Sequence, residues 1–180
     1  SDIILGKDHQ CLHITTDKIA VVAKFLFENE NCYFDMLSCI TALDNGVEKA
    51  TMEVIYNLYS IPYEHKIMLK VVVPRNAKDE PAPSVPTLSH IWRTADWHER
   101  EAYDMMGVRF RGHPDLRRIL MWDGYPYFPL RKDFPLAGKP TDLPEVAFTK
   151  PAPLEGGPFV TVAGGKDSMA REPRVRVPEN

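Results

Sequence analysis

The chain has 180 residues and a formal net charge of −3, and 44% of its residues are hydrophobic. This length suits one domain with a substantial core and leaves room for an extended tail. A slightly negative charge argues against electrostatic binding of nucleic acid or anionic lipid, so no nucleic-acid partner is expected. No apolar run approaches the ~20 residues that span a bilayer, and the N-terminus has no signal-peptide pattern. Any membrane association is therefore expected to come through partners.

Cysteine usage limits the cofactors that the chain can hold. Cys11, Cys32 and Cys39 are the three cysteines, and none of them forms a C-x-x-C pair. Iron–sulfur and zinc sites need such paired spacings. We expect reduced, mostly buried thiols and no metal cluster in this chain.

The first half of the chain predicts one helix and four strands. Apolar and polar residues alternate over 9–15, as in a half-buried strand, and Thr15 or Thr16 can then cap a helix with apolar positions three and four apart. Further strands are predicted at 33–43, 51–60 and 65–73. Their short connections, one containing Asn45-Gly46, favour antiparallel neighbours. The pattern indicates an α+β domain: a four-stranded sheet with the N-terminal helix packed on one face.

The second half predicts short helices and then a tail. Residues 74–86 are read as a loop, followed by helices at 87–92 and 96–106, the latter with Asp96 as its N-cap and Gly107 as its stop. On the second helix Trp97, Tyr103 and Met106 can point inward. After Pro135 the composition is rich in Pro and Gly without periodicity, which is typical of an extended tail ordered by a neighbour. The predicted division is a sheet domain at 1–75, loops and short helices at 76–136, and a partner-wrapping tail at 137–180.

The segment at 97–136 is unusually dense in charged and aromatic residues. Buried charges must be paired and hydrogen-bonded, so such a segment lies either on a wet surface or against a partner that completes the pairs. Arg and aromatic residues are also enriched in the cores of protein interfaces. We therefore predict that this segment contacts a partner.

Catalytic and metal-binding interpretations of this segment have weaker support. A zinc-protease H-E-x-x-H pattern beginning at His98-Glu99 would need a second His at position 102, which is Ala. Glu99 and Tyr103 are one helical turn apart and could form an acid–base pair, but a Glu beside Arg100 is more typical of an ion-paired face. No Walker, G-x-S-x-G or G-x-G-x-x-G pattern occurs.

A turn at Gly112-His113-Pro114 leads into a strand or helix at 116–120. This turn is either an ordinary surface turn or a fixed corner that presents Arg117 and Arg118 to a partner. The charged run that begins at Leu130 is flanked by prolines, so it has no helix to lie on, and intermolecular pairing is favoured.

Three runs in this order, EREAYDMMG, FRGHPDLRRIL and PLRKDFPL, carry a family resemblance. They resemble the signature of the 30-kilodalton, C-type subunit of respiratory complex I, the proton-pumping NADH:quinone oxidoreductase. Residues 97–136 are called the signature segment from here on. Phe128 stands where the family usually has His, which argues that an imidazole is not needed for chemistry at that position.

The resemblance implies a structural, non-catalytic subunit of the peripheral arm of that enzyme. It implies docking on the 49-kilodalton, D-type subunit that helps form the quinone site, with iron–sulfur subunits as neighbours. It places NADH, FMN, iron–sulfur clusters and quinone in the complex and none of them in this chain. It also implies a peripheral position on the cytoplasmic face of the bacterial inner membrane, or on the matrix side in mitochondria.

The same resemblance gives roles to eleven interface residues. Five are expected to order the signature helix: Glu99, Arg100, Glu101, Tyr103 and Asp104. His113 forms the corner, and five residues are expected to pair with the partner: Arg117, Arg118, Arg131, Lys132 and Asp133.

Two alternatives remain open from the sequence. One is the equivalent subunit of a related membrane-bound hydrogenase or chloroplast-type quinone reductase, which the electron donor of the purified complex would distinguish. The other is a stand-alone hydrolase built on Glu99, Tyr103 and His113, which activity or bound metal in the single chain would support.

Overall fold

The computed structural model describes residues 3–5, 10–77, 80–136 and 138–139. The chain divides into two compact units, Ser1–Phe134 and Pro135–Asn180, and the description below concerns the first. The predicted tail at 137–180 lies outside the described residues, apart from Gly138 and Lys139.

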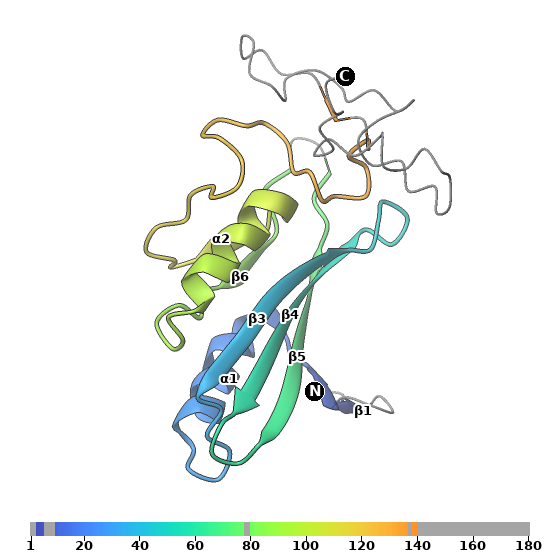
Figure 1. Cartoon of the computed structure of the whole chain (residues 1–180). Coiled ribbons are helices and arrows are strands. Elements are labelled where there is room, and N and C mark those ends of the chain that lie inside the picture. The colour runs from blue at the N-terminus through green and yellow to red at the C-terminus, as the bar shows by residue number, and fades with distance from the viewer. Residues whose placement is uncertain (1–2, 6–9, 78–79, 137, 140–180) are drawn as a thin grey trace, which may run out of the picture. The chain divides into compact units, whose positions relative to one another are not determined.

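The main element of the first unit is a mixed sheet of five strands in the order β1-β2-β5-β4-β3 (Figure 1). Its strands are β1 (Ile3–Leu5), β2 (Gln10–His13), β3 (Met36–Asp44), β4 (Thr51–Ser60) and β5 (His65–Pro74). Successive strands β3, β4 and β5 pair antiparallel, as their short connections predict, while β2 pairs parallel with β5. All four predicted strands are present, and the short β1 extends the sheet beyond β2.

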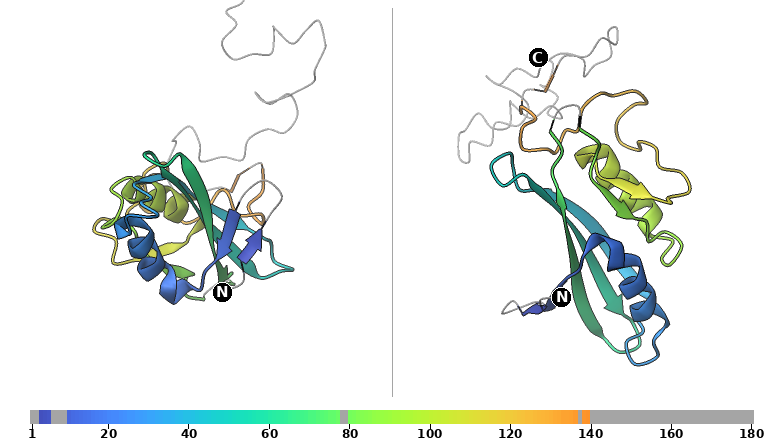
Figure 2. Two further views of the ribbon diagram at one scale, coloured as in Figure 1. Left: turned by 90° about the horizontal axis from the view of Figure 1, so that it is seen from below. Right: turned by 180° about the vertical axis from the view of Figure 1, so that it is seen from behind.

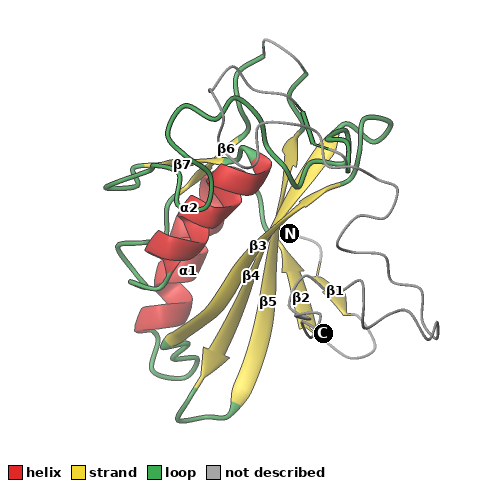
Figure 3. Ribbon diagram, turned by 45° about the horizontal axis from the view of Figure 1, so that its top comes forward, coloured by secondary structure: helices red, strands yellow, loops and turns green. Residues whose placement is uncertain are grey.

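One face of the sheet builds the core. Strand β4 alternates strictly, and its inward residues Met52, Val54, Tyr56 and Leu58 are almost completely buried. Each such side chain stabilises the fold by roughly 1.5–3 kcal/mol relative to exposure. Helices α1 (Ile19–Glu28) and α2 (Ala95–Met106) both contribute to the core on this face, and Figures 2 and 3 show them on the same side of the strands. The confirmed α+β class therefore has two layers.

Helix α1 begins differently from the prediction. A short 3₁₀ helix (Thr16–Lys18) precedes it, and the Thr15 side chain makes no capping hydrogen bond. The backbone N–H of Lys18 instead donates to the Thr15 carbonyl, at 3.0 Å. The predicted threonine side-chain cap was therefore wrong, because this tight backbone turn starts the helix.

The chain after β5 contains structure that the sequence pattern does not announce. Strand β6 (Ser84–Pro86) lies in the predicted loop and pairs parallel with β7 (Arg109–Arg111). The predicted helix at 87–92 is wrong, since these residues form turns that lead into α2. The predicted helix at 96–106 is confirmed with one more residue at its start, and Asp96 lies in its first turn instead of at its N-cap.

Neither α1 nor α2 has the length and apolar character to cross a membrane, and these are the two α-helices of the described residues.

Candidate partner-binding surface

Helix α2 turns two acidic side chains inward, which organise the signature segment. The side chains of Glu99 and Asp104 are both completely buried. Glu101, between them, is exposed, so the charged face of this helix is divided between core and solvent. Each buried carboxyl has its own set of hydrogen-bond donors.

Asp104 fixes the segment that follows β7. Three consecutive backbone N–H groups donate to its Oδ2 atom at 2.7–3.0 Å: those of Ile119, Leu120 and Met121. Arg118 donates to its Oδ1 atom at 2.5 Å. Burial alone would raise the pKa of Asp104, but these donors outweigh burial and lower it. The predicted strand or helix at 116–120 is therefore absent, because this carboxylate satisfies backbone groups that regular structure would otherwise pair.

Arg118 is part of the same internal network. Its guanidinium also donates to the carbonyl of Tyr127, at 3.1 Å, and lies over the rings of Tyr125 and Phe128. Its side chain is only 10% exposed. Arg118 therefore pairs within the chain, although the sequence interpretation assigned it to a partner.

Arg131 binds the C-terminal end of α2. It donates to the carbonyl of Met106 at 2.8 Å and to the side-chain oxygen of Asn76 at 2.9 Å, and it stacks on Phe128 at 4.7 Å. Gly107 ends the helix with a φ of +75°, and a Cβ atom there would lie 2.7 Å from both Arg131 Nη2 and the Phe128 ring. The glycine is needed both for its left-handed conformation and for this close approach.

Gly107→Ala is therefore expected to lower the free energy of unfolding by about 2 kcal/mol, through left-handed strain and displacement of Phe128. Gly124→Ala is the matched control, because Gly124 has a φ of +83° and nothing within 4 Å of an added Cβ. It should cost about 1 kcal/mol, from the backbone alone. Urea unfolding of the purified chain measures both, and equal losses would contradict the close-contact argument.

The run that contains Lys132 and Asp133 joins the ends of two strands. Arg75 donates to Asp44 at 2.9 Å and to Asp133 at 2.7 Å, and the backbone N–H of Lys132 donates to Asp44 at 3.0 Å. Burial would raise the pKa of Asp44, but Arg75 and the backbone donors lower it. Asp133 is thus paired internally, while the Lys132 side chain is exposed.

Glu99 occupies a second buried cluster. Its Oε1 accepts from the Leu88 N–H at 2.6 Å, and its Oε2 lies 2.5 Å from Thr87 Oγ1. Burial is the largest influence and raises the pKa of Glu99 to about 7. Thr87 Oγ1 also lies 2.8 Å from Ser89 Oγ, yet its hydroxyl carries one hydrogen. A protonated Glu99 can donate to Thr87, and an ionised Glu99 can accept from it, since the Ser89 hydroxyl has a hydrogen of its own for the second contact.

His113 lies beside this carboxyl. Its Nδ1 accepts from the Asp115 N–H at 3.0 Å, so Nε2 carries the proton and donates to the backbone carbonyl of Asp96, at 3.2 Å. Nε2 is 3.9 Å from Glu99 Oε2, and both side chains are fully buried. The hydrolase interpretation needs these groups to meet a substrate, but no solvent reaches either side chain in this structure.

Other large side chains of the signature segment face solvent instead. They include Trp97, Arg117, Leu120 and Leu130. Trp97 is 64% exposed, so its predicted inward position was wrong. The buried Arg100 lies 5.0 Å from its ring and donates to the carbonyl of Arg117 at 3.3 Å. Arg117 therefore points to solvent, whereas the next residue, Arg118, points to the interior. Tyr103, on α2, is half-buried.

No set of three His, Cys, Asp or Glu side chains suitable for a metal ion occurs in the described part of the chain. The three cysteines are free and half-buried, which corrects the expectation of mostly buried thiols.

Sequence reasoning missed the residues that hold the signature segment. Asp44, Arg75 and Asn76 bind it across 88, 58 and 55 positions of sequence, and Thr87 binds Glu99 across 12. No local periodicity reports such pairings. A lone Asp or Arg at the end of a predicted strand was the only available signal.

Comparison with known proteins agrees with this geometry. The family described as respiratory-chain NADH dehydrogenase, 30 Kd subunit, matches residues 12–140. A C-type subunit of the NADH-quinone oxidoreductase of Rhizobium meliloti is 43% identical over 142 residues, which are 79% of this chain and 75% of that protein. A combined C/D-type subunit of the same enzyme from a Sulfurihydrogenibium species is 38% identical over 143 residues, 78% of this chain and 24% of that protein.

The fold also recurs in a solved structure, a chain of the membrane-bound sulfane sulfur reductase, an archaeal respiratory membrane complex. Its TM-score is 0.63 at 24% identity, covering 75% of this chain and 77% of that one. That likeness concerns the fold alone. The family match and the identity to C-type subunits together show that this chain belongs to the family of the 30-kilodalton subunit of respiratory-chain NADH dehydrogenase.

Proposed function

We propose that this chain is a structural subunit of the peripheral arm of a proton-pumping NADH:quinone oxidoreductase. It docks on the 49-kilodalton, D-type subunit and supports electron transfer from NADH to quinone without holding a redox centre itself. NADH, FMN, iron–sulfur clusters and quinone belong to its neighbours in this proposal. The chain reaches the membrane only through the complex, on the cytoplasmic face in bacteria or the matrix side in mitochondria.

The observation that carries the proposal is the division of the signature segment into an internally paired base and an exposed rim. Asp104 pairs with Arg118, and Arg131 donates to the Met106 carbonyl and to Asn76, so the shape of the segment is fixed from within the chain. Trp97 and Arg117 remain exposed on this base. Trp and Arg on a rigid support are the residue types that dominate binding energy at protein interfaces.

A relative whose name combines the C and D types supports the choice of partner. This chain matches only 24% of that protein, so most of the relative lies outside the match. Linking two polypeptides in one chain raises the effective concentration of each for the other, which favours their contact. A subunit that combines the C and D types is therefore expected where these two parts bind each other.

The signature charges take two roles in this proposal. Glu99, Arg100, Asp104, His113, Arg118, Arg131 and Asp133 shape the base through contacts within the chain, and Glu101, Tyr103, Arg117 and Lys132 are left to meet the partner. Arg131→Glu would therefore disturb folding, because Arg131 bonds Met106 and Asn76. Arg117 gives a cleaner test.

Arg117→Glu is expected to leave the isolated chain folded and to reduce recovery of the 49-kilodalton-type subunit. The Arg117 side chain is 67% exposed, and among the described residues its ion pair is with the exposed Asp115, at 2.9 Å, so its loss should cost little stability. A charge reversal at an interface adds like-charge repulsion or leaves a buried charge unpaired. Affinity purification from mildly solubilised membranes, with mass spectrometry of the co-purified proteins, measures the result.

Lys24→Glu is the control, since Lys24 is a comparably exposed cation on α1. Full assembly of the Arg117→Glu protein would refute the rim as an interface. A wild-type chain recovered alone from the soluble fraction would refute the subunit function itself.

A further inference from the structure

The sheet face opposite the helices carries exposed apolar side chains beside polar ones such as Glu53, Asn57 and Lys70. Antiparallel sheets with one solvated face usually place polar residues on it. Here Met36, Leu43 and Val72 are 43–45% exposed, and the strand register adds Ile55 and Met68 to the same face. No described helix covers this face (Figure 1). We call it the open face.

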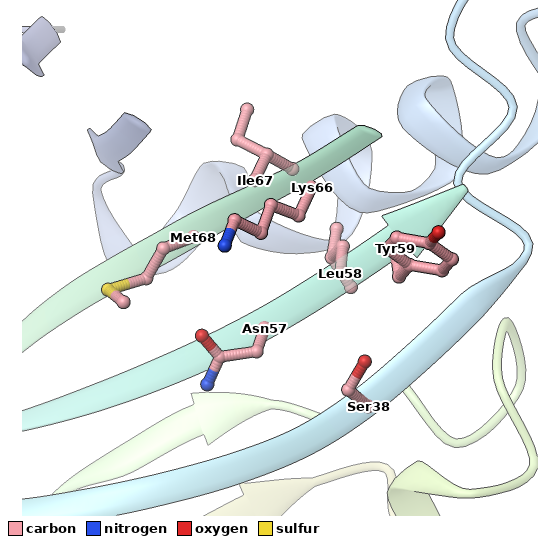
Figure 4. Close-up of a pocket in the computed structure, with 7 residues that line it drawn as sticks. All are labelled: Ser38, Asn57, Leu58, Tyr59, Lys66, Ile67 and Met68. Atoms are coloured by element: carbon pink, nitrogen blue, oxygen red, sulfur yellow. The ribbon is translucent and has the colours of Figure 1, made fainter. Parts of the chain in front are cut away.

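A hollow of about 180 Å³ lies in the open face, over β3, β4 and β5. Figure 4 shows Asn57, Tyr59, Lys66 and Met68 around it, with α1 behind the strands. Asn57 donates to Cys39 Sγ at 3.1 Å. The hollow therefore combines apolar walls with an amide, a phenol and an ammonium group.

Of the two lysines on the open face, Lys66 and Lys70, one has an ion pair within the described ranges and the other does not. Lys70 and Glu53 are 3.2 Å apart and mostly buried, so they neutralise each other. Burial would raise the pKa of Glu53, but Asn45 and Lys70 lower it, which fits a stable pair. Lys66 has no ion pair among the described residues. It is exposed to solvent and lies at the edge of the hollow without a carboxylate partner in the described part of the chain.

We infer that the open face is a second docking surface, which binds an apolar segment of a neighbouring subunit that presents one Asp or Glu side chain to Lys66. The inference rests on the proposed function, because it assigns a further contact within the same complex. An apolar partner segment would bury the exposed apolar side chains of this face, and Lys66 would then need an anion, because such a cover excludes water from its ammonium group. Charge complementarity therefore selects an acidic side chain from the partner.

Amine labelling of the intact complex with an acetylating reagent tests this. Each lysine is compared between the purified chain and the complex, by mass spectrometry. Lys66 should be labelled at least about tenfold more slowly in the complex, as expected for a side chain in a desolvated interface. Equal labelling in both states would overturn the inference.

Carbodiimide cross-linking identifies the occupant. The reagent activates a carboxyl group as an O-acylisourea, and a lysine amine in contact attacks the acyl carbon, which forms the amide and expels the reagent as a urea. The Lys66 Nζ should therefore form an amide with an Asp or Glu of another subunit. A cross-link from Lys66 to a carboxyl of this same sequence would overturn the inference, since a second copy or the chain's own tail would then cover the face.

Two variants separate this inference from the proposed function. Lys66→Glu should reduce recovery of the assembled complex by about tenfold or more, whereas Lys66→Arg should retain it, because only the first reverses the charge. Lys24→Glu on the opposite, helical side is the control. Equal recovery of Lys66→Glu and wild type would overturn this inference alone. A wild type that recovers no partner would overturn the proposed function as well.

Discussion

Asp104→Ala is expected to lower the free energy of unfolding by about 3–5 kcal/mol, because it leaves a buried charge unpaired. The substitution removes the acceptor of three backbone N–H groups and the partner of Arg118. Arg118 is only 10% exposed, so its guanidinium would stay largely buried without the carboxylate that pairs with it. Urea unfolding of the purified full chain measures the loss.

Asp115→Ala is the matched control for this prediction. Asp115 also pairs with an arginine of the signature segment, but both side chains of that pair are exposed, so its loss should cost no more than about 0.5 kcal/mol. Asp104→Asn should fall between the two variants, since an amide keeps one oxygen for the backbone donors and loses the charge. A cost for Asp104→Ala as small as that of Asp115→Ala would contradict the anchoring role of Asp104.

The anchoring role explains why irregular chain can serve as a binding surface. Residues 116–121 have no helix or strand, yet Asp104 holds three of their N–H groups. A loop fixed in this way loses less conformational entropy when a partner binds, which favours affinity. In our proposal, the buried charges of the signature segment favour binding by fixing the shape of the loop. Exposed residues such as Arg117 make the contacts with the partner.

Local periodicity predicts the sheet of this chain well. Strand β4 occupies Thr51–Ser60 as its alternation indicates, and α2 ends at Met106 before Gly107. Strands β6 and β7 were missed because each has only three residues and pairs with a distant segment. Short non-local strands have no repeat long enough to produce a pattern.

The charged residues show a different limit of sequence reasoning. Their density in the signature segment indicates that they must be paired, but density alone does not say with what. Asp133 accepts from Arg75, and Arg131 donates to Asn76. Each partner is more than 50 positions away, so both residues pair within the chain. The exposed residues of the segment could be separated from the buried ones only once the fold placed α2 and the β5 terminus together.

Glu99 is expected to make the stability of the chain fall as the pH rises from about 4.5 to about 7. Its pKa is raised from 4.5 to about 7 in the folded chain, chiefly by burial. Below pH 4.5 the carboxyl is protonated in both states, so the folded state carries no penalty. Between the two values the unfolded chain releases this proton while the folded chain retains it, which favours unfolding. Above the folded pKa the contribution is constant, and its full size is about 3 kcal/mol.

Glu99→Gln isolates this effect, because the amide can donate to Thr87 and accept from Leu88 as a protonated carboxyl does. Asp44, Glu53 and Asp104 have lowered pKa values and act in the opposite direction, so they stabilise the fold above their unfolded values and lose this effect as the pH falls. These three groups are present in both proteins and cancel in the difference.

The quantity to measure is the unfolding free energy of Glu99→Gln minus that of the wild type, from urea titrations between pH 4 and pH 8. This difference should rise by about 3 kcal/mol across the range. Glu101→Gln, on the exposed side of the same helix, should give a flat difference. A flat difference for Glu99→Gln as well would contradict the raised pKa, because it would mean that burial does not change the proton affinity of Glu99 on folding.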